Sequence, residues 1–309
     1  MTLIRPLLSV PPIGELINEG AQGSVYRLQG DSSLVFKQYH EGIEPDRRGF
    51  QALVNWPHSL SPLDRTIIEQ RTAWPRNFIQ PVNATIQGCL MPLIPQRFFV
   101  SDGTTTFELH AQILHVDLVS GTPFPQPTPL QRYQLVLSFL EVVEVLHRNT
   151  MIIGDISAKN ILWCIKGSQG QPEIYLIDCD SFRVMGERPP VPQSDTPHWV
   201  PPHSFREIRS DDMVGERTKS DDLYKVGLFV IRTLLARNAD RDINNALNDG
   251  RTLQNLLDVI ANSGVSVTKG RARHIADLFR RSQEFPMDCP EAHEWIDALT
   301  ATRIFTRVQ

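Results

Sequence analysis

Apolar and polar residues alternate along the first part of the chain. The alternation runs from residue 13 to about residue 40 around turn residues, and FIQPVNATIQGCLMPLI at 78–94 resumes it. Such alternation is typical of antiparallel strands with one buried face. Between these stretches, PLDRTIIEQRTA at 62–73 begins with proline and continues at helical spacing. The pattern therefore predicts a small sheet with one inserted helix.

The pattern changes after Ile94. The segment GTPFPQPTP at 121–129 is too rich in proline for a regular element. From residue 130, LQRYQLVLSFLEVVEVLH places its apolar residues on one broad face, which predicts a long helix. The same test predicts three more helices, over residues 221–237, 271–281 and 290–300.

Length and composition fit a globular protein with two lobes. The chain has 309 residues, of which 41% are hydrophobic and 21% are charged. The predicted fold class is α+β. An N-terminal lobe, residues 1–94, holds the sheet and the inserted helix, and a C-terminal lobe, residues 95–309, is mainly helical.

The charge balance argues against two classes of partner. The formal net charge is -4, whereas proteins that bind nucleic acid or anionic membranes generally carry an excess of lysine and arginine. The most apolar stretch, VGLFVIRTLLA at 226–236, contains Arg232 and is far shorter than the roughly 20 apolar residues that span a bilayer. We therefore expect neither a nucleic acid nor a membrane as a partner.

The cysteines and the N-terminus predict a cytoplasmic protein. The four cysteines form no CxxC pair, so they suggest neither a disulfide framework nor a zinc site. MTLIRPLLSVPPIG at 1–14 is broken by arginine and proline and lacks the apolar core of a signal peptide. Both features fit a reducing compartment.

The segment NEGAQGSV at 18–25 places Gly20 and Gly23 between two strand-like stretches. Two glycines three residues apart are most often turn residues, so this motif alone is weak. Lys37 in LVFK interrupts a following apolar strand, either as a residue of an exposed face or as a group that reaches into a phosphate site. Other positions must decide between these alternatives.

Two downstream loops carry acidic residues beside apolar strands. Asp155 and Asn160 lie in MIIGDISAKNILW, and Asp178 ends the apolar stretch of EIYLIDCDSF. One such aspartate is often only a turn residue. Two acid-bearing loops that follow a glycine loop and a strand lysine are much harder to explain in that way.

Together these motifs resemble those of the protein-kinase family. NEGAQGSV is similar to the family's G-x-G-x-x-G-x-V, and Lys37 corresponds to its strand lysine. The residues from Asp155 through Asn160 are similar to the catalytic-loop motif D-x-x-x-x-N, and DCD at 178–180 is similar to D-F-G. TPHWVPPH resembles the family's T-P-E-Y-x-A-P-E, and SDDLYKVG ends in its D-x-x-x-x-G signature. The resemblance covers about residues 13–300. It implies a two-lobed kinase fold and ATP- and Mg²⁺-dependent transfer of the γ-phosphate to serine or threonine hydroxyls of protein substrates, the chain itself included.

The resemblance implies a phosphate site around the glycine loop. The backbone of residues 20–24 would cover the triphosphate, because glycine lets that backbone approach closely. Lys37 would bind the α- and β-phosphates. It would need an anionic partner on the inserted helix, for which we expect Glu69, with Asp64 as the alternative.

The resemblance also implies metal and catalytic residues. Asn160 and Asp178 offer the hard oxygen ligands that suit Mg²⁺, and Asp155 would accept or orient the substrate hydroxyl. The family's lysine two residues after the catalytic aspartate is absent, because Ser157 stands there. We expect Lys159 to supply the charge near the γ-phosphate instead, as a catalytic residue.

The adenine would lie between Val25 and Leu162, and the backbone at 92–94 after Met91 would serve as the hinge. For these apolar residues, plain core packing is an open alternative. The full set of nucleotide contacts that the resemblance implies is Asn18, Gly20, Ala21, Gln22, Gly23, Val25, Lys37, Glu69, Met91, Leu93 and Leu162.

Several departures from the family pattern motivate other functions. The histidine and arginine of H-R-D are Ile153 and Gly154, and Asp180 replaces the glycine of D-F-G, which adds a second carboxylate near the metals. One alternative is therefore a nucleotide-binding pseudokinase that serves as a scaffold. A small-molecule kinase of the aminoglycoside or choline type is another, but such enzymes lack a peptide-docking segment like TPHWVPPH. The position of Lys159 is one where tyrosine kinases commonly carry a basic residue, whereas Thr196 in that segment favours serine/threonine specificity.

Three shorter segments resemble a narrower group. GDISAKN, LIDCDSF and the WP before the last predicted strand of the sheet are similar to divergent bacterial kinases encoded beside von Willebrand A-type proteins and metal-dependent protein phosphatases. A phosphatase and an A-domain protein are therefore implied as candidate partners, in addition to protein substrates.

Overall fold

The N-terminal part of the chain forms a five-stranded antiparallel sheet with the strand order β1-β2-β3-β5-β4. The computed structural model describes residues 4–115, 121–193, 196, 198–201, 217–235, 272–283 and 288–300. The strands of this sheet are β1 (Ile13–Glu19), β2 (Gly23–Leu28), β3 (Leu34–Tyr39), β4 (Asn77–Ile79) and β5 (Gly88–Pro92). The sheet that the alternation predicts is therefore confirmed.

The segment between β3 and β4 holds two helices where the pattern predicts one. Helix α2 (Pro62–Arg71) covers all but the last two residues of the predicted range, and Ser61 caps it by accepting a hydrogen bond from the Asp64 N–H. Helix α1 (Arg47–Asn55) precedes it and is capped by Asp46. A 3-10 turn, η1 (Trp56–Ser59), joins the two. The pattern misses α1 because RRGFQALVN is short and carries a glycine, which weakens a helix.

The later part of the chain is mainly helical, as predicted. Helix α3 (Pro129–Arg148) begins directly after the proline-rich segment, where Thr128 and Gln131 form a capping box. The other three predicted helices correspond to α4 (Lys219–Leu235), α7 (Ala272–Gln283) and α8 (Ala292–Thr300). Residues 236–237 and 271 of the predicted ranges lie outside the described residues. No helix in the described part of the chain is both long and apolar enough to cross a membrane.

Short strands and 3-10 turns frame the loops that carry acidic residues. The pattern does not predict the pairing of these strands into three two-stranded sheets, β6 with β7, β9 with β10 and β8 with β11. The strands are β6 (Phe99–Ser101), β7 (Thr106–Glu108), β8 (Met151–Ile152), β9 (Ile161–Cys164), β10 (Glu173–Leu176) and β11 (Arg183–Val184). The 3-10 turns are η2 (Gln96–Phe98), η3 (Ala111–His115) and η4 (Cys179–Ser181).

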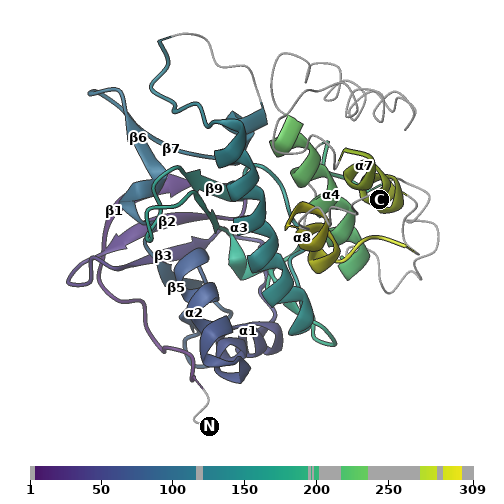
Figure 1. Cartoon of the computed structure of the whole chain (residues 1–309). Coiled ribbons are helices and arrows are strands. Elements are labelled where there is room, and N and C mark those ends of the chain that lie inside the picture. The colour runs from purple at the N-terminus through teal and green to yellow at the C-terminus, as the bar shows by residue number, and fades with distance from the viewer. Residues whose placement is uncertain are drawn as a thin grey trace, which may run out of the picture.

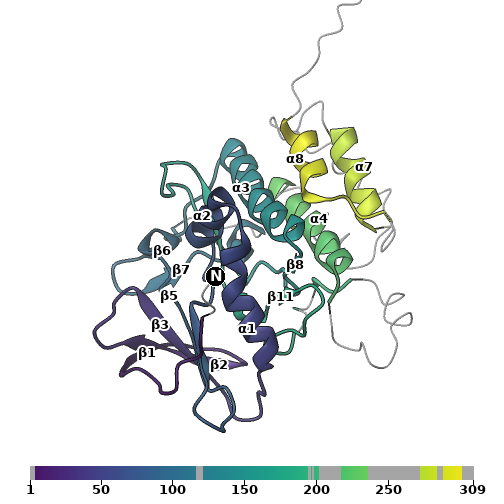
Figure 2. The same cartoon turned by 90° about the horizontal axis from the view of Figure 1, so that it is seen from below.

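The two larger apolar clusters among the described residues hold these parts together. Figures 1 and 2 show the five-stranded sheet on one side of the molecule and α4, α7 and α8 on the other, with α3 between them. The larger core surrounds α3 and α4, where the rings of Phe139 and Phe229 lie 4.1 Å apart. The second core joins the sheet to β9 and β10 through Phe78, Leu162 and Tyr175. This packing brings the loops that follow β8 and β10 up to the sheet.

Candidate active site

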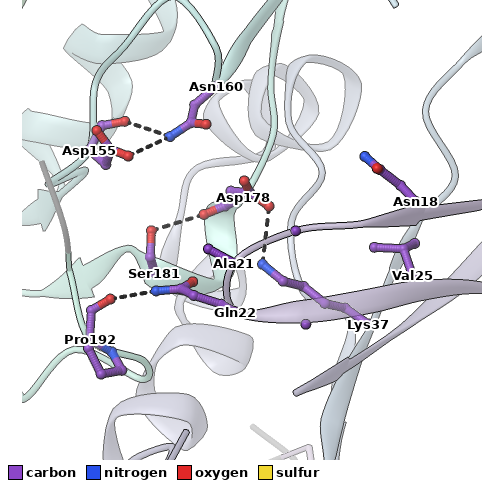
Figure 3. Close-up of a pocket in the computed structure, with 12 residues that line it drawn as sticks. Asn18, Ala21, Gln22, Val25, Lys37, Asp155, Asn160, Asp178, Ser181 and Pro192 are labelled. Atoms are coloured by element: carbon purple, nitrogen blue, oxygen red, sulfur yellow. Dashed lines mark hydrogen bonds and ion pairs between the residues drawn. The ribbon is translucent and has the colours of Figure 1, made fainter. Parts of the chain in front are cut away.

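Residues from distant stretches of the chain meet in one pocket of about 220 Å³ (Figure 3). The turn between β1 and β2 and strand β3 supply one side, and the loops after β8 and β10 supply the other. The pocket is lined by Asn18, Gly20, Ala21, Gln22, Gly23, Val25, Lys37, Asp155, Asn160, Asp178, Ser181 and Pro192. All of them except Ser181 and Pro192 are among the residues that the sequence motifs single out.

The two glycines of the turn stand there for different reasons. Gly23 pairs with Tyr39 of β3, and a Cβ at Gly23 would lie 2.3 Å from the carbonyl oxygen of Gln38. At Gly20, apart from its chain neighbours, the nearest atom to a Cβ would lie 3.7 Å away. The pairing of β2 with β3 therefore requires Gly23, whereas the fold itself does not require Gly20.

Lys37 lies on β3 with its side chain 7% exposed, and its ammonium contacts two carboxylates from the loop after β10. Its Nζ donates to Oδ1 of Asp180 at 2.9 Å and to Oδ1 of Asp178 at 3.1 Å. Burial disfavours the charged ammonium, but the attraction of Asp180 and Asp178 outweighs it and holds the pKa of Lys37 above its usual range. The lysine therefore places a fixed positive charge in the pocket.

The two aspartates that contact Lys37 have different surroundings. The Asp180 side chain is 0% exposed, and its Oδ2 accepts a hydrogen bond from the Tyr39 hydroxyl at 2.8 Å. The Asp178 side chain is 52% exposed and lines the pocket. Asp180 thus adds a second carboxylate beside Asp178, but it is buried and both of its oxygens have protein partners.

The backbone at Asp178 is unusual for a residue with a side chain. Its φ of 55° lies in the left-handed region, and its carbonyl accepts a hydrogen bond from the Ser181 hydroxyl at 3.0 Å. Such conformations require support from the surrounding structure and cluster at functional sites. Ser181 supplies part of that support and also lines the pocket.

The expected partners of Lys37 on the inserted helix lie elsewhere. Glu69 is exposed in part and pairs with Arg76, with 3.5 Å between Oε1 and Nη1, and it does not line the pocket. Asp64 accepts a hydrogen bond from Arg148 of α3. Both predicted partners of Lys37 are therefore wrong, because α2 packs against α3 and its carboxylates pair with nearby arginines.

Asp155 and Asn160 face each other across the loop between β8 and β9. Asn160 Nδ2 donates to the carbonyl oxygen and to Oδ2 of Asp155, both at 3.0 Å, so Asn160 Oδ1 is not part of this pair of bonds. The Thr196 hydroxyl donates to Asp155, at 3.1 Å from Oδ1 and 3.3 Å from Oδ2. A side-chain hydroxyl thus lies against the Asp155 carboxylate. Residues 197, 202 and 203 of TPHWVPPH lie outside the described residues.

Helix α4 fixes the backbone of this loop. Asp222 accepts hydrogen bonds from the N–H groups of Ile153 and Gly154, at 2.7 and 2.8 Å. Lys225, which is fully buried, donates to the Gly154 carbonyl at 2.6 Å. Burial raises the pKa of Asp155, and the charge of Lys225 partly opposes that effect. The ionised Asp155 is therefore a stronger base than an exposed aspartate.

Asp178 and Asn160 line the pocket and carry oxygens that could hold a divalent cation. Mg²⁺ is typically bound by one or two carboxylates, with substrate phosphates and waters completing its coordination. Among the described residues, no group of three or more histidine, cysteine, aspartate or glutamate side chains could hold a metal ion. The donor set therefore fits a magnesium ion that binds together with phosphates, and it does not fit a closed zinc site.

Most of the predicted adenine contacts lie away from the pocket. Leu162 and Met91 are buried in the core between the sheet and β9. The Leu93 N–H donates to the Ser33 carbonyl at 2.8 Å, so it extends the sheet. Val25 does line the pocket. Leu162 and Met91 thus pack in the apolar core, and their contact with the base stays a prediction.

Lys159 is also outside the pocket. Its side chain is exposed, and its carbonyl oxygen lies 2.7 Å from Nδ1 of His110. Asn160 turns inward to Asp155 at this point, and its neighbour Lys159 remains on the outside of the loop. Lys159 therefore does not line the pocket, and its role near the γ-phosphate stays a prediction.

The sequence motifs miss two residues that line the pocket. Pro192 contributes its carbonyl, which accepts a hydrogen bond from Gln22 Nε2 at 2.8 Å. No motif marks such a residue, because a main-chain carbonyl is independent of the side chain. Ser181 directly follows DCD, and a hydroxyl beside a predicted metal ligand is a signal that could have identified it.

In comparisons with known proteins, no family model matches this chain, and no curated protein matches it either. The function of the pocket must therefore be argued from its own geometry and from the sequence motifs.

Proposed function

We propose that this chain is an ATP- and Mg²⁺-dependent protein kinase that transfers the γ-phosphate to serine or threonine hydroxyls. One observation carries the proposal: Lys37, Asp155, Asn160 and Asp178, which are far apart in the sequence, line one pocket beside the glycine turn. Phosphoryl transfer depends mainly on positioning and on neutralising charge. It needs a cation for the phosphates, oxygen ligands for magnesium and a group that orients the hydroxyl, and these residues supply all three.

Each group would act in the surroundings that the structure gives it. Lys37 would bind phosphate oxygens, and Asp178 with the Oδ1 of Asn160 would hold Mg²⁺, which neutralises phosphate charge when bound. Asp155 would accept a hydrogen bond from the substrate hydroxyl, in the place where Thr196 now donates one. A serine or threonine hydroxyl suits this position because a threonine hydroxyl already fits it.

The arrangement of the chain supports the same proposal. The sheet with its glycine turn comes first and the helices follow, and Asp222 of the D-x-x-x-x-G motif bonds the backbone beside Asp155. The motifs that resemble a kinase are thus joined by hydrogen bonds as well as by their order. A two-lobed kinase fold, with lobes at 1–94 and 95–309, is part of the proposal.

A nucleotide-binding scaffold without phosphotransfer is the second candidate. It is favoured by the position of Lys159 outside the pocket and by the burial of Leu162 and Met91, because Val25 is then the predicted apolar adenine contact that lines the pocket. A small-molecule kinase is less well supported, because Thr196 places a segment of the chain against Asp155 where a small substrate would bind.

The same proposal includes the partners and the location, which are inferred from sequence motifs and composition. The proposed partners are protein substrates, a metal-dependent phosphatase and a von Willebrand A-type protein, and the proposed location is the cytoplasm.

The proposal is tested with purified protein, labelled ATP and Mg²⁺, with phosphosites located by mass spectrometry. Label should reach serine or threonine residues of the chain itself or of lysate proteins, and Asp155→Ala should abolish the transfer. Asp31→Ala is the matched control, since this aspartate accepts a hydrogen bond within a turn and does not line the pocket. Nucleotide binding without transfer would favour the scaffold, and transfer only to aminoglycosides or choline would favour the small-molecule kinase.

A further inference from the structure

The ammonium of Lys37 requires an anion that remains bound to it when a ligand fills the pocket. Among the described residues, Lys37 Nζ contacts the carboxylates of Asp178 and Asp180. Asp178 is half exposed and faces the pocket, so a magnesium ion would compete with Lys37 for its oxygens. Asp180 faces no such competition, because Lys37 and Tyr39 occupy its two oxygens and solvent does not reach it.

The inserted helices offer no replacement for Asp180. Helix α1 has the sequence RRGFQALVN, which contains no acidic residue. On α2, Asp64 and Glu69 pair with Arg148 and Arg76. The anion for Lys37 therefore comes from η4, the same turn that follows the pocket residue Asp178.

We infer that Asp180 is the positioning residue for Lys37, in place of a carboxylate on a helix. The inference rests on the proposed function, since it assigns Asp180 a role in holding Lys37 toward the nucleotide phosphates. One short turn then carries both the metal ligand Asp178 and the anchor of the lysine. The anchor of Lys37 then lies on η4, whereas the carboxylates of α2 pair with Arg148 and Arg76.

The test compares Asp180→Asn with Glu69→Gln, which removes the negative charge of an exposed carboxylate on α2. In Asp180→Asn, kcat for phosphotransfer should fall by about 10- to 100-fold. This loss is smaller than the one expected when the positive charge of Lys37 is itself removed. The KM for ATP should rise at the same time. Glu69→Gln should stay within about twofold of wild type, because it breaks only an exposed ion pair. Equal losses in the two variants would overturn the inference.

Variants that already lack Lys37 distinguish a positioning role of Asp180 from a structural role. In Lys37→Met, the further change Asp180→Asn should leave the remaining kcat/KM unchanged, because Asp180 acts only through Lys37. An additional loss would show that Asp180 supports the site in some other way and would overturn the inference.

Urea denaturation of the same variants gives a readout that does not depend on activity. The double variant Lys37→Met/Asp180→Asn should unfold at a higher urea concentration than Lys37→Met alone, because it no longer buries an unpaired carboxylate. Lys37→Met/Glu69→Gln should show no such recovery, and equal recovery by both would count against Asp180. A wild type without phosphotransfer would reject the proposed function, while this comparison would still decide which carboxylate holds Lys37.

Discussion

The floor and the rim of the pocket are built in different ways. We call floor the pocket residue Lys37 together with Asp180 and Tyr39, two buried residues that do not line the pocket, and we call rim residues 18–22. The floor side chains are buried and bonded to one another. Residues 18–21 of the rim are exposed, and Gln22 bonds the rim to Pro192 on the opposite side of the pocket. Since buried charges require complete pairing and exposed loops do not, changes at the floor should alter stability and changes at the rim should alter binding.

The largest effect is expected at the floor. Lys37→Ala leaves the buried Asp180 carboxylate without its cation, so the free energy of unfolding should fall by about 3–5 kcal/mol. Phosphotransfer should fall by roughly 100- to 1000-fold, because a positioned positive charge is lost. Urea denaturation and initial-rate assays measure the two effects. Normal stability in this variant would show that the ion pair does not hold the floor together.

Asp178 lies between the floor and the rim, and the effect of its removal should be on binding alone. Asp178→Asn should weaken Mg²⁺-dependent ATP binding by about 100-fold, because it removes a metal ligand. The free energy of unfolding should change by less than about 1 kcal/mol, since the side chain is half exposed and Asp180 still pairs with Lys37. Calorimetric titration with ATP, in Mg²⁺ and in EDTA, measures the affinity. Unchanged affinity in Mg²⁺ would exclude Asp178 as a metal ligand.

Substitutions at Gly20 and Gly23 should have different effects, one on ATP binding and the other on stability, although both residues belong to one turn. Gly23→Ala should lower the free energy of unfolding by about 1–3 kcal/mol, because its Cβ would collide with the Gln38 carbonyl. Gly20→Ala should leave the unfolding temperature unchanged while it weakens ATP binding, because the space beside Gly20 is open in the fold. Thermal unfolding with and without MgATP distinguishes the two. If Gly20→Ala binds ATP normally, the turn is an ordinary hairpin and does not cradle phosphate.

Local pattern predicts most of the fold, and the helix that it misses has a long-range reason. Alternation and helical spacing place the five-stranded sheet and the helices from α2 onward. Helix α1 is missed because Gly49 weakens its pattern. The structure explains this glycine, since a Cβ there would lie 2.4 Å from the carbonyl oxygen of Arg188. Close packing against a segment far along the chain cannot be read from a window of neighbouring residues.

Contacts between distant segments also decide which parts of the site can be predicted from the sequence. The motifs identify residues that line the pocket, such as Lys37, Asp155 and Asp178, because their spacing carries the resemblance. The partner of Lys37 is missed, since Asp180 lies 143 residues away and the choice between it and Glu69 depends on how α2 packs. The burial of Leu162 likewise depends on how β9 meets the sheet.

The smallest effect is expected at the rim. Gln22→Ala removes one exposed hydrogen bond, from Nε2 to the Pro192 carbonyl, which joins the glycine turn to the far side of the pocket. The KM for ATP should rise by about two- to fivefold, which is the change in affinity expected from the loss of one exposed hydrogen bond. The kcat and the unfolding temperature should stay near those of wild type. Gln29→Ala is the matched control, because Gln29 makes a similar exposed bond to the Ile13 carbonyl, at 2.9 Å, and does not line the pocket. Since both variants lose the same kind of bond, a difference in KM between them measures what the closure of the rim contributes to nucleotide binding. Equal KM values would mean that the rim binds nucleotide without the bond to Pro192, and a lower unfolding temperature for Gln22→Ala would mean that the rim shares the structural role of the floor.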